Sequence, residues 1–242
     1  MSKKNEPVSF NPVFVKTKNV RNFSVLMDGL DLAAGEGRLG MVYGRAGRGK
    51  TRTAQWYAAH NNCVYIRVWT IWSELDFLKA LARELGVVNP PGRRGTCAAE
   101  IVDRLVSAPR PIFLDEIEKL SRRHLDTIRD ISDTCAVPIV LIGEEELVTV
   151  MRANRRVWSR TYQQVEFAPI TAADILLYAG EATGLKLETP QARIMHEASG
   201  GDFRIVRRDL LTLIQYANAR GTNTADADMV KMAVKSGLNG AN

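Results

Sequence analysis

Short apolar runs alternate with amphipathic stretches through the first two thirds of the chain. Four apolar runs, each of a length typical of a buried strand, cover 39–43, 63–68, 111–114 and 137–142, and the more polar stretch 164–167 is predicted as a last strand. Helices are predicted in the stretches between them, over 51–59, 72–85, 98–107, about 117–134 and 145–156, and in 72–85 apolar residues recur at helical spacing. Strands that alternate with helices predict an α/β fold with a parallel, doubly wound sheet.

The pattern changes after Pro169, where only helical stretches follow. Glycines stand just after three of these stretches, as expected of helix C-caps. We therefore expect an α/β core over residues 1–168 and a small C-terminal helical domain over 169–242. Residues 1–37 are mixed and polar, with a short apolar island at 11–15, and we assign no regular element to them.

Composition places the chain among ordinary globular proteins. Its 242 residues are 45% hydrophobic and 25% charged, and no apolar run approaches the roughly 20 residues of a membrane helix. Residues 1–7 lack the apolar segment of a secretory signal. Cys63, Cys97 and Cys135 are too few and too widely spaced for a disulfide framework or a zinc site. We therefore expect reduced thiols and a cytoplasmic location.

The net charge is +6, and most of the positive charge comes from 23 arginines, against ten lysines. The planar guanidinium binds phosphate through paired hydrogen bonds, so this balance is compatible with nucleic-acid binding. A mildly basic, solvated surface would give the same balance, and charge alone leaves both interpretations open.

The clearest motif follows the first predicted strand. Residues 44–51 have the form G-x-x-x-x-G-K-T: Gly44, Arg45, Ala46, Gly47, Arg48, Gly49, Lys50 and Thr51, with Arg52 next in the predicted helix. A strand, a glycine-rich turn and a helix N-terminus direct N–H groups and the helix dipole toward a polyphosphate. We expect Lys50 to reach the β- and γ-phosphates of ATP and the Thr51 hydroxyl to bind Mg²⁺.

Two acids follow the third predicted strand. Asp115 and Glu116 come directly after the apolar run 111–114, about 65 residues after the P-loop. Asp115 is expected in the Mg²⁺ shell, and Glu116 is placed to orient and deprotonate the attacking water. A strand that merely ends at the surface in two acids is the alternative, and the P-loop upstream favours catalysis.

Phosphoryl transfer also needs positive charge on the developing oxyanions, which an arginine finger supplies. The spacing of Arg152, Arg155 and Arg156 predicts one helix face, and for Arg152 we favour a solvated basic face. Arg160, in the stretch 158–161, is the preferred functional arginine.

With these motifs the chain resembles an AAA+ ATPase over nearly all of its length: Walker A, Walker B, a strand with a polar end near Glu144, a Ser-Arg element and a helical lid. The stretch 156–160 resembles the arginine-finger box of initiator-type members, with Arg156 as the alternative to Arg160. The stretch 201–204 resembles sensor 2, which makes Arg204 the lid arginine near the γ-phosphate. The resemblance implies catalysis by Lys50, Glu116 and Arg160. Glu144 departs from the neutral residue usual at sensor 1.

More narrowly, the chain resembles the phage Mu transposition protein B group and related target-selector ATPases of transposons. The stretches that carry this resemblance are 39–44, 141–147 and 202–210. The resemblance implies an ATP-dependent hexameric or helical homo-oligomer on duplex DNA, in the cytoplasm of a bacterial or phage-infected cell. Such an assembly selects and delivers target DNA and activates a transposase, and ATP hydrolysis disassembles it.

Two basic stretches are candidates for DNA contact. The predicted loop 92–96, with Arg93, Arg94 and Thr96, is the first choice because it is basic and lies where the resembling proteins face DNA. Arg122 and Arg123 come second, since i,i+4 pairs of Arg122 with Asp126 and of Arg129 with Asp133 would make this helix an ordinary solvated one. We see no aromatic ladder for single strands, so we expect sequence-independent binding to the duplex backbone, weakened steeply by salt.

Other functions share the same core. A helicase-loader or replication-initiator ATPase would contact a replicative helicase, and an ATP-dependent signalling or scaffold module would bind DNA weakly. A small-molecule kinase is disfavoured by the helical lid and the Ser159-Arg160 element.

Overall fold

The computed structural model describes residues 7–33 and 38–239. Within them, the contacts between residues divide the chain into two compact units. One unit comprises 19–45 and 49–167, and the other comprises 46–48 together with the described residues up to Lys18 and from Ala168 onward. No helix among the described residues is both long enough and apolar enough to cross a bilayer.

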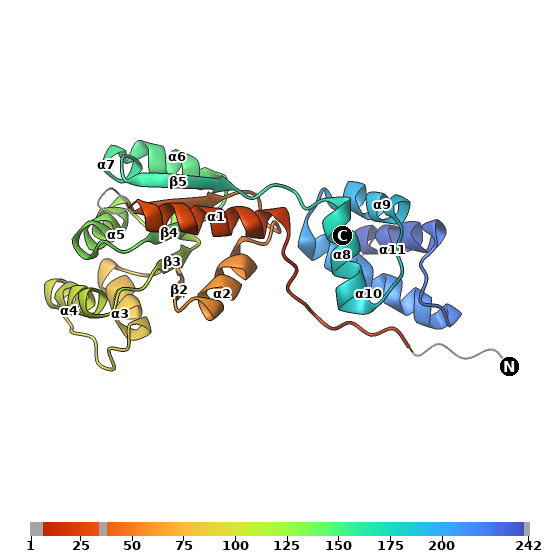
Figure 1. The fold of residues 1–242 in the computed structure, drawn as a ribbon, viewed down its shortest axis with the longest axis horizontal. Coiled ribbons are helices and arrows are strands. Elements are labelled where there is room, and N and C mark those ends of the chain that lie inside the picture. The colour runs from red at the N-terminus through yellow and green to blue at the C-terminus, as the bar shows by residue number, and fades with distance from the viewer. Residues whose placement is uncertain (1–6, 34–37, 240–242) are drawn as a thin grey trace. The chain divides into compact units, whose positions relative to one another are not determined.

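The first unit is built on a five-stranded parallel sheet in the described residues (Figure 1). Its strands are β1 (Leu39–Tyr43), β2 (Val64–Arg67), β3 (Ile112–Asp115), β4 (Ile139–Ile142) and β5 (Thr161–Glu166). They lie in the order β2-β3-β4-β1-β5. Because every strand is parallel to its neighbours, the residues that follow β1, β3 and β4 meet at one edge of the sheet.

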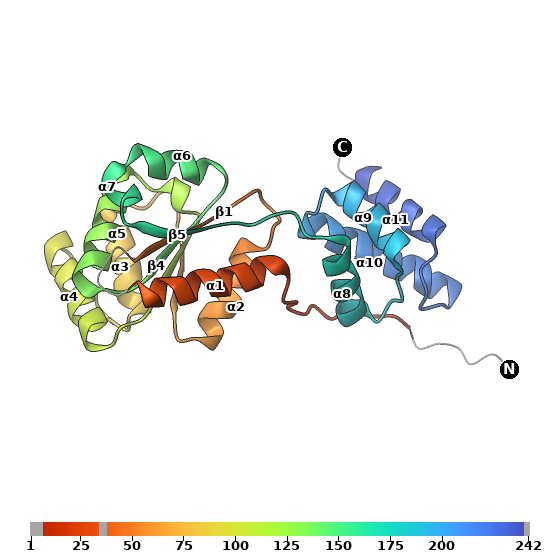
Figure 2. The same ribbon diagram turned by 45° about the horizontal axis from the view of Figure 1, so that its top comes forward.

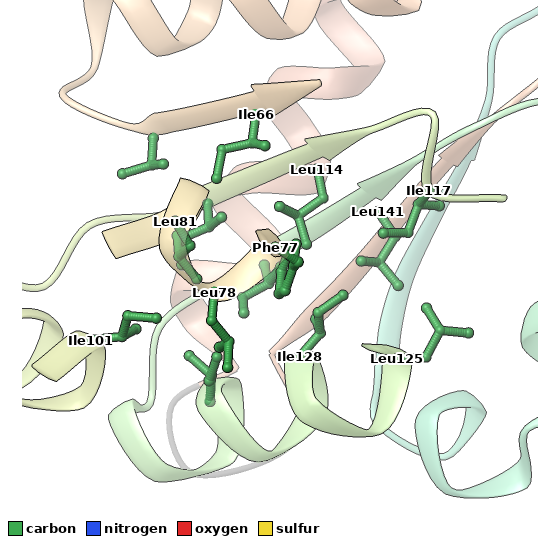
Figure 3. Close-up of a cluster of buried hydrophobic side chains, with 14 of the residues drawn as sticks. Ile66, Phe77, Leu78, Leu81, Ile101, Leu114, Ile117, Leu125, Ile128 and Leu141 are labelled. Carbon is green, nitrogen blue, oxygen red and sulfur yellow. The ribbon is translucent and has the colours of Figure 1, made fainter. Parts of the chain in front are cut away.

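Helices cover both faces of this sheet (Figures 1 and 2). They are α1 (Lys18–Leu32), α2 (Lys50–His60), α3 (Glu74–Glu84), α4 (Arg94–Ser107), α5 (Arg122–Cys135), α6 (Glu146–Ala153) and α7 (Arg155–Trp158), with a 3₁₀ turn, η1, at Ile117–Lys119. Strand residues alternate between two buried clusters. One cluster contains residues of α1 and α2, and the other contains residues of α3 to α7. Figure 3 shows the second cluster, where Phe77, Leu78 and Ile128 face Leu114 and Leu141. The predicted parallel α/β fold is therefore confirmed.

Several elements differ from the sequence prediction. The sequence pattern predicts no regular element before residue 38, yet α1 forms there and buries Phe23, Leu26, Met27 and Leu30. Helix α4 begins at Arg94, so most of the predicted loop 92–96 is the first turn of a helix. The predicted helix 145–156 is two helices, because the backbone of Asn154 leaves the helical region with φ −104° and ψ 85°.

The second unit contains α8 (Ala172–Thr183), α9 (Thr189–Ser199), α10 (Phe203–Arg220) and α11 (Ala227–Asn239). Thr171 and Asp174 form a capping box that starts α8, and glycines in the left-handed region follow α8, α9 and α10. The last helix begins later than the predicted start at Thr224, with the Met229 amide donating to Asp226 Oδ1 at 2.7 Å.

The segment that precedes α1 also packs on these helices, although the sequence interpretation grouped it with residues 1–168. The Asn11 amide donates to the Ala182 carbonyl at 2.7 Å, and Asn218 exchanges two hydrogen bonds with the backbone of Val8. Arg207 lies over the Phe10 ring, 5.3 Å from its centroid. The unit also includes Ala46–Arg48, where the Phe203 amide donates to the Gly47 carbonyl at 2.9 Å.

Candidate nucleotide-binding site

The glycine-rich turn after β1 has the backbone that its sequence requires. Gly44, Gly47 and Gly49 all have positive φ, at 139°, 78° and 92°. A side chain on Gly44 would place its Cβ 2.7 Å from the Phe167 carbonyl oxygen, so close packing excludes any other residue there. Gly49 is the N-cap of α2, and the turn therefore leads directly into a helix N-terminus. This is the arrangement that favours an anionic ligand.

Lys50 lies in the first turn of α2 with only 9% of its surface exposed. Its Nζ donates to the carbonyl oxygens of Gly44 and Arg45, the second at 3.0 Å. These bonds hold the ammonium group inside the turn. Phosphate oxygens accept hydrogen bonds from an ammonium group more strongly than neutral carbonyls do, so a bound phosphate could replace these partners. The basic side chains of Arg45 and Arg52 are exposed beside the turn, and Arg48 donates to the Gly200 carbonyl at 2.6 Å.

Thr51 and Asp115 meet at the carboxyl edge of the sheet. Thr51 Oγ1 donates to Asp115 Oδ2 at 2.7 Å, and the Glu116 amide donates to Asp115 Oδ1 at 3.0 Å. A hydroxyl carries one proton and two lone pairs. Thr51 donates its proton in the hydrogen bond to Asp115, so its lone pairs stay available to a cation. Asp115 is 2% exposed. A hydroxyl and a buried carboxylate are oxygen donors of the kind that Mg²⁺ prefers, so the pair fits this ion.

Glu116 follows in a strained backbone conformation, with φ 61° and ψ 39°. Non-glycine residues seldom occupy this left-handed region, and they do so most often at functional sites. Its carboxylate is ion-paired with both Arg67 and Lys119. Burial raises the pKa of Glu116, but hydrogen bonds and charges from Lys119 and Arg67 outweigh burial and hold that pKa below its usual value. Glu116 is thus ionised, with its oxygens engaged by two cations.

The residues after β4 approach a different acid. Glu144, which was predicted at the sensor 1 position, has an exposed side chain. Its backbone N–H donates to Glu118, whose pKa is raised mainly by burial. Gly143 leaves the space that the Glu118 carboxylate fills, and Glu118 Oε2 has no hydrogen-bond partner among the described residues. The acid beside the backbone of Glu144 is therefore the half-buried Glu118, which no sequence motif marks.

The arginine candidates do not share one helix face. Arg152 is in α6 and stacks over the Trp158 ring at 5.4 Å, whereas Arg155 and Arg156 are in α7, beyond the break at Asn154. The predicted common face is wrong for this reason. Arg160 stands immediately before β5, and its Nε donates to Asp133 Oδ2 at 3.2 Å. Arg204 is exposed in the first turn of α10, where its amide donates to Asp202 Oδ1.

The residues proposed for DNA contact are exposed, but their partners within the protein differ. Arg93 is the N-cap of α4, and Arg94 is ion-paired with Glu74. Thr96 Oγ1 donates to the Arg93 carbonyl at 3.0 Å. An open hollow of about 540 Å³ is lined by Ser73, Glu74, Leu75, Gly92, Arg93 and Arg94.

The second pair, Arg122 and Arg123, is exposed at the start of α5. The i,i+4 pairs expected on this helix are not formed. Arg129 instead pairs with Asp126 and Asp130, and Asp133 pairs with Arg160.

Sequence reasoning missed three residues that contact the site. Tyr65 and Arg67 are in β2, and Lys119 is in η1. No motif marks them, because they contact Asp115 and Glu116 only through the pairing of β2 with β3 and through the turn after β3. One sequence feature could have indicated Arg67: it is a basic residue at the end of an apolar strand, and the next strand along the chain ends in two acids.

Comparison with known proteins agrees with this geometry. A family model described as an AAA domain matches residues 33–151. The Mu-like prophage FluMu DNA transposition protein B of Haemophilus influenzae is 27% identical over 206 residues, which are 81% of this chain and 70% of that protein. The ATP-dependent target DNA activator B of Escherichia phage Mu is 29% identical over 147 residues. That match covers 60% of this chain but only 46% of the phage Mu protein.

Solved structures show the same fold. The ORC2 protein of Aeropyrum pernix superposes with a TM-score of 0.71 at 16% identity, covering 94% of this chain and 70% of that one. Cdc6p of Pyrobaculum aerophilum gives a TM-score of 0.69 at 18% identity, covering 96% and 72%. These likenesses establish the fold alone. In sequence, the chain is similar to the transposition B proteins of phage Mu and of a Mu-like prophage, and its residues 33–151 match an AAA domain.

Proposed function

We propose that this protein is an ATP-dependent DNA-binding ATPase that assembles on duplex DNA, delivers it as a target and activates a transposase, and that hydrolysis disassembles the complex. The observation that carries the proposal is the convergence of Lys50, Thr51, Asp115 and Glu116 at one edge of the sheet, in a chain whose relatives are named target DNA activators. We place the protein in the cytoplasm of a bacterial or phage-infected cell.

ATP binding follows from the turn after β1. The backbone N–H groups of residues 45–51 and the N-terminus of α2 receive the polyphosphate, and Lys50 exchanges its carbonyl partners for β- and γ-phosphate oxygens. Thr51 and Asp115 would hold Mg²⁺, which when bound neutralises charge on the phosphates. Lys50 would add a second positive charge at the phosphates.

Glu116 is the proposed general base. It is ionised and can accept a proton from the attacking water only when its oxygens turn away from Arg67 and Lys119. Because two cations occupy the proposed base in this arrangement, we expect this arrangement to hydrolyse ATP slowly. We infer that DNA binding or contact with a neighbouring subunit releases Glu116, so that hydrolysis is fastest in the assembled state.

The remaining basic residues are proposed to act from a neighbouring subunit, from the helical domain or on DNA. Arg160 acts on the nucleotide of a neighbouring subunit, and leaves Asp133 to do so. Residues 169–242 form the lid, from which Arg204 approaches the γ-phosphate. Arg93, Arg94, Arg122 and Arg123 contact DNA phosphates without sequence preference.

Electron microscopy with duplex DNA tests the proposal. The protein is incubated with DNA and a slowly hydrolysed ATP analogue or with ADP, and assemblies on DNA are expected only with the analogue. Lys50→Ala should bind neither nucleotide and should form no assembly. Equal DNA coating with ADP, or normal nucleotide affinity in Lys50→Ala, would contradict the proposal.

A further inference from the structure

Tyr65 brings a hydroxyl to the carboxylate of Asp115. The tyrosine lies in β2, which pairs with β3 so that Tyr65 stands opposite Phe113. Its hydroxyl donates to Asp115 Oδ2 at 2.8 Å, the same oxygen that accepts from Thr51 at 2.7 Å. With the Glu116 amide on Oδ1, the carboxylate receives three donors from three different segments. Both of its oxygens are therefore fixed in direction.

The tyrosine is itself held in place. Val64 and Ile66 face the cluster under α3 to α7, so Tyr65 faces the opposite side of the sheet, where it packs with the cluster of α1 and α2. Gln55, one turn after Thr51 in α2, hydrogen-bonds to the Tyr65 oxygen. Burial, followed by the charge of Asp115, raises the pKa of Tyr65, so its hydroxyl stays protonated and remains a donor. Gln55, Tyr65, Asp115 and Thr51 form one continuous network.

We propose that Tyr65 is a positioning residue for the metal-binding pair: by fixing Asp115 Oδ2 as the acceptor of the Thr51 proton, it turns the lone pairs of Thr51 toward Mg²⁺. This inference rests on the proposed ATPase function. Without the phenol, Asp115 can rotate or accept from water, and Thr51 can donate elsewhere, for example to a phosphate oxygen. Tyr65 acts through Asp115 and needs no contact of its own with nucleotide or metal.

The substitution Tyr65→Phe removes the hydroxyl and keeps the ring. Binding of a fluorescent ATP analogue is measured in EDTA and across a Mg²⁺ titration, together with steady-state hydrolysis. We expect wild-type affinity in EDTA, because Lys50 and the backbone are untouched. The Mg²⁺ concentration that gives half of the metal-dependent gain in affinity should rise roughly tenfold, the scale of one hydrogen bond to a charged group. Hydrolysis should largely recover at saturating Mg²⁺.

Tyr57→Phe is the matched control. Tyr57 belongs to the same buried cluster, with ring centroids 5.3 Å from Phe23 and 5.8 Å from Phe113, and it should keep the wild-type Mg²⁺ dependence. A double-mutant cycle with Asp115→Asn separates positioning from general destabilisation. In the Asp115→Asn background, Tyr65→Phe should cause no further change in Mg²⁺ dependence, even if thermal stability falls.

The outcomes are distinguishable. A wild-type Mg²⁺ dependence in Tyr65→Phe, or an equal effect of Tyr65→Phe with and without the Asp115 carboxylate, overturns the inference and leaves the proposed function standing. A wild-type protein that neither binds nor hydrolyses ATP overturns both.

Discussion

Glu116 shows how single residues control this site. Its left-handed backbone is a conformation that a non-glycine residue adopts at a cost of about 1–3 kcal/mol. The cost is offset in part by the ion pairs to Arg67 and Lys119, which also occupy the carboxylate that we propose as the general base. Because Arg67 is 61% exposed at its side chain, this clamp is open to solvent and to a binding partner, and opening it costs little.

Replacing Arg67 should therefore release the base. We expect Arg67→Ala to raise the DNA-independent rate of ATP hydrolysis by about two- to fivefold, since an exposed ion pair is weak and its loss changes the position of Glu116 only modestly. Stimulation by DNA should shrink by a similar factor. The measurement is steady-state phosphate release with and without duplex DNA. Arg104→Ala, which removes an exposed pair with Glu100 on α4, is the control. An unchanged or lower basal rate in Arg67→Ala would show that the clamp does not limit hydrolysis.

At the scale of residues, the sequence predicts site residues that belong to a known motif. It does not predict residues that reach the site only because the chain folds. Thr51 and Asp115 are 64 residues apart, and the P-loop and strand-end patterns predict their shared function. Tyr65, Arg67 and Lys119 belong to no such pattern. Arg67 meets Glu116 only because β2 pairs with β3 in a register that sets Arg67 opposite Asp115. Register between strands distant in sequence is not encoded in any local stretch.

At the scale of elements, strands and most helices follow from local pattern, and the exceptions have specific causes. The buried strands are continuous apolar runs because helices cover both sheet faces. Helix α1 is a different case, because Phe23, Leu26, Met27 and Leu30 recur at helical spacing and its signal is present in the sequence although no helix was expected there. The helix predicted over 145–156 breaks because the Asn154 side chain caps α7 and bonds to Asp126 on α5, contacts that local spacing does not show.

Asn154 should consequently matter for stability. Its side chain is 2% exposed, accepts from the Val157 amide at 3.5 Å and donates to Asp126 at 3.2 Å. We expect Asn154→Ala to lower the free energy of unfolding by about 1–2 kcal/mol, the range for lost N-caps. Urea denaturation followed by circular dichroism measures this, with the exposed Arg155→Ala as the control. If Asn154→Ala lowers the free energy of unfolding by no more than Arg155→Ala does, the Asn154 hydrogen bonds do not stabilise the break between α6 and α7.

The start of α4 makes a second prediction at this scale. Arg93 is the N-cap of the helix, and its side chain has no ion pair with any residue that the structure describes, whereas Arg94 must leave Glu74 before it can neutralise a phosphate. We expect Arg93→Ala to weaken duplex binding and to reduce the slope of log affinity against log salt by about one. Arg94→Ala should change the slope less. Affinities are measured at several salt concentrations.

Arg220→Ala serves as the control for both substitutions, because it removes an exposed arginine that pairs with Asp226 at the end of α10. It should leave affinity and slope unchanged. If Arg93→Ala also leaves the salt slope unchanged, the DNA contact lies elsewhere, and Arg122 with Arg123 becomes the first alternative.

At the scale of the whole molecule, the sequence indicates an α/β core followed by helices, but it does not show where the segment before α1 belongs. Residues 8–17 follow no helical or strand period, yet Phe10 packs on Tyr178 and Val15 is buried among residues of the helical unit. The chain therefore passes between the helical unit and the sheet unit four times: after Lys18, on each side of the segment 46–48, and after Phe167. Any movement of one unit against the other must accommodate all four connections.

Assembly is the property that a single chain cannot display, and Arg160 offers a way to test it. If Arg160 acts on a neighbour's nucleotide, each active site combines Glu116 of one subunit with Arg160 of another. Arg160→Ala and Glu116→Gln should each hydrolyse ATP slowly when alone, while both bind it. Mixed in equal amounts on DNA, they should recover about a quarter of wild-type activity, because one interface in four pairs an intact Glu116 with an intact Arg160 in a head-to-tail assembly. Phosphate release during a titration of one variant into the other measures this. Arg152→Ala, whose side chain stacks on Trp158 in its own subunit, should be active alone. Activity that stays at the sum of the two separate variants would place Arg160 at its own subunit's nucleotide or outside catalysis.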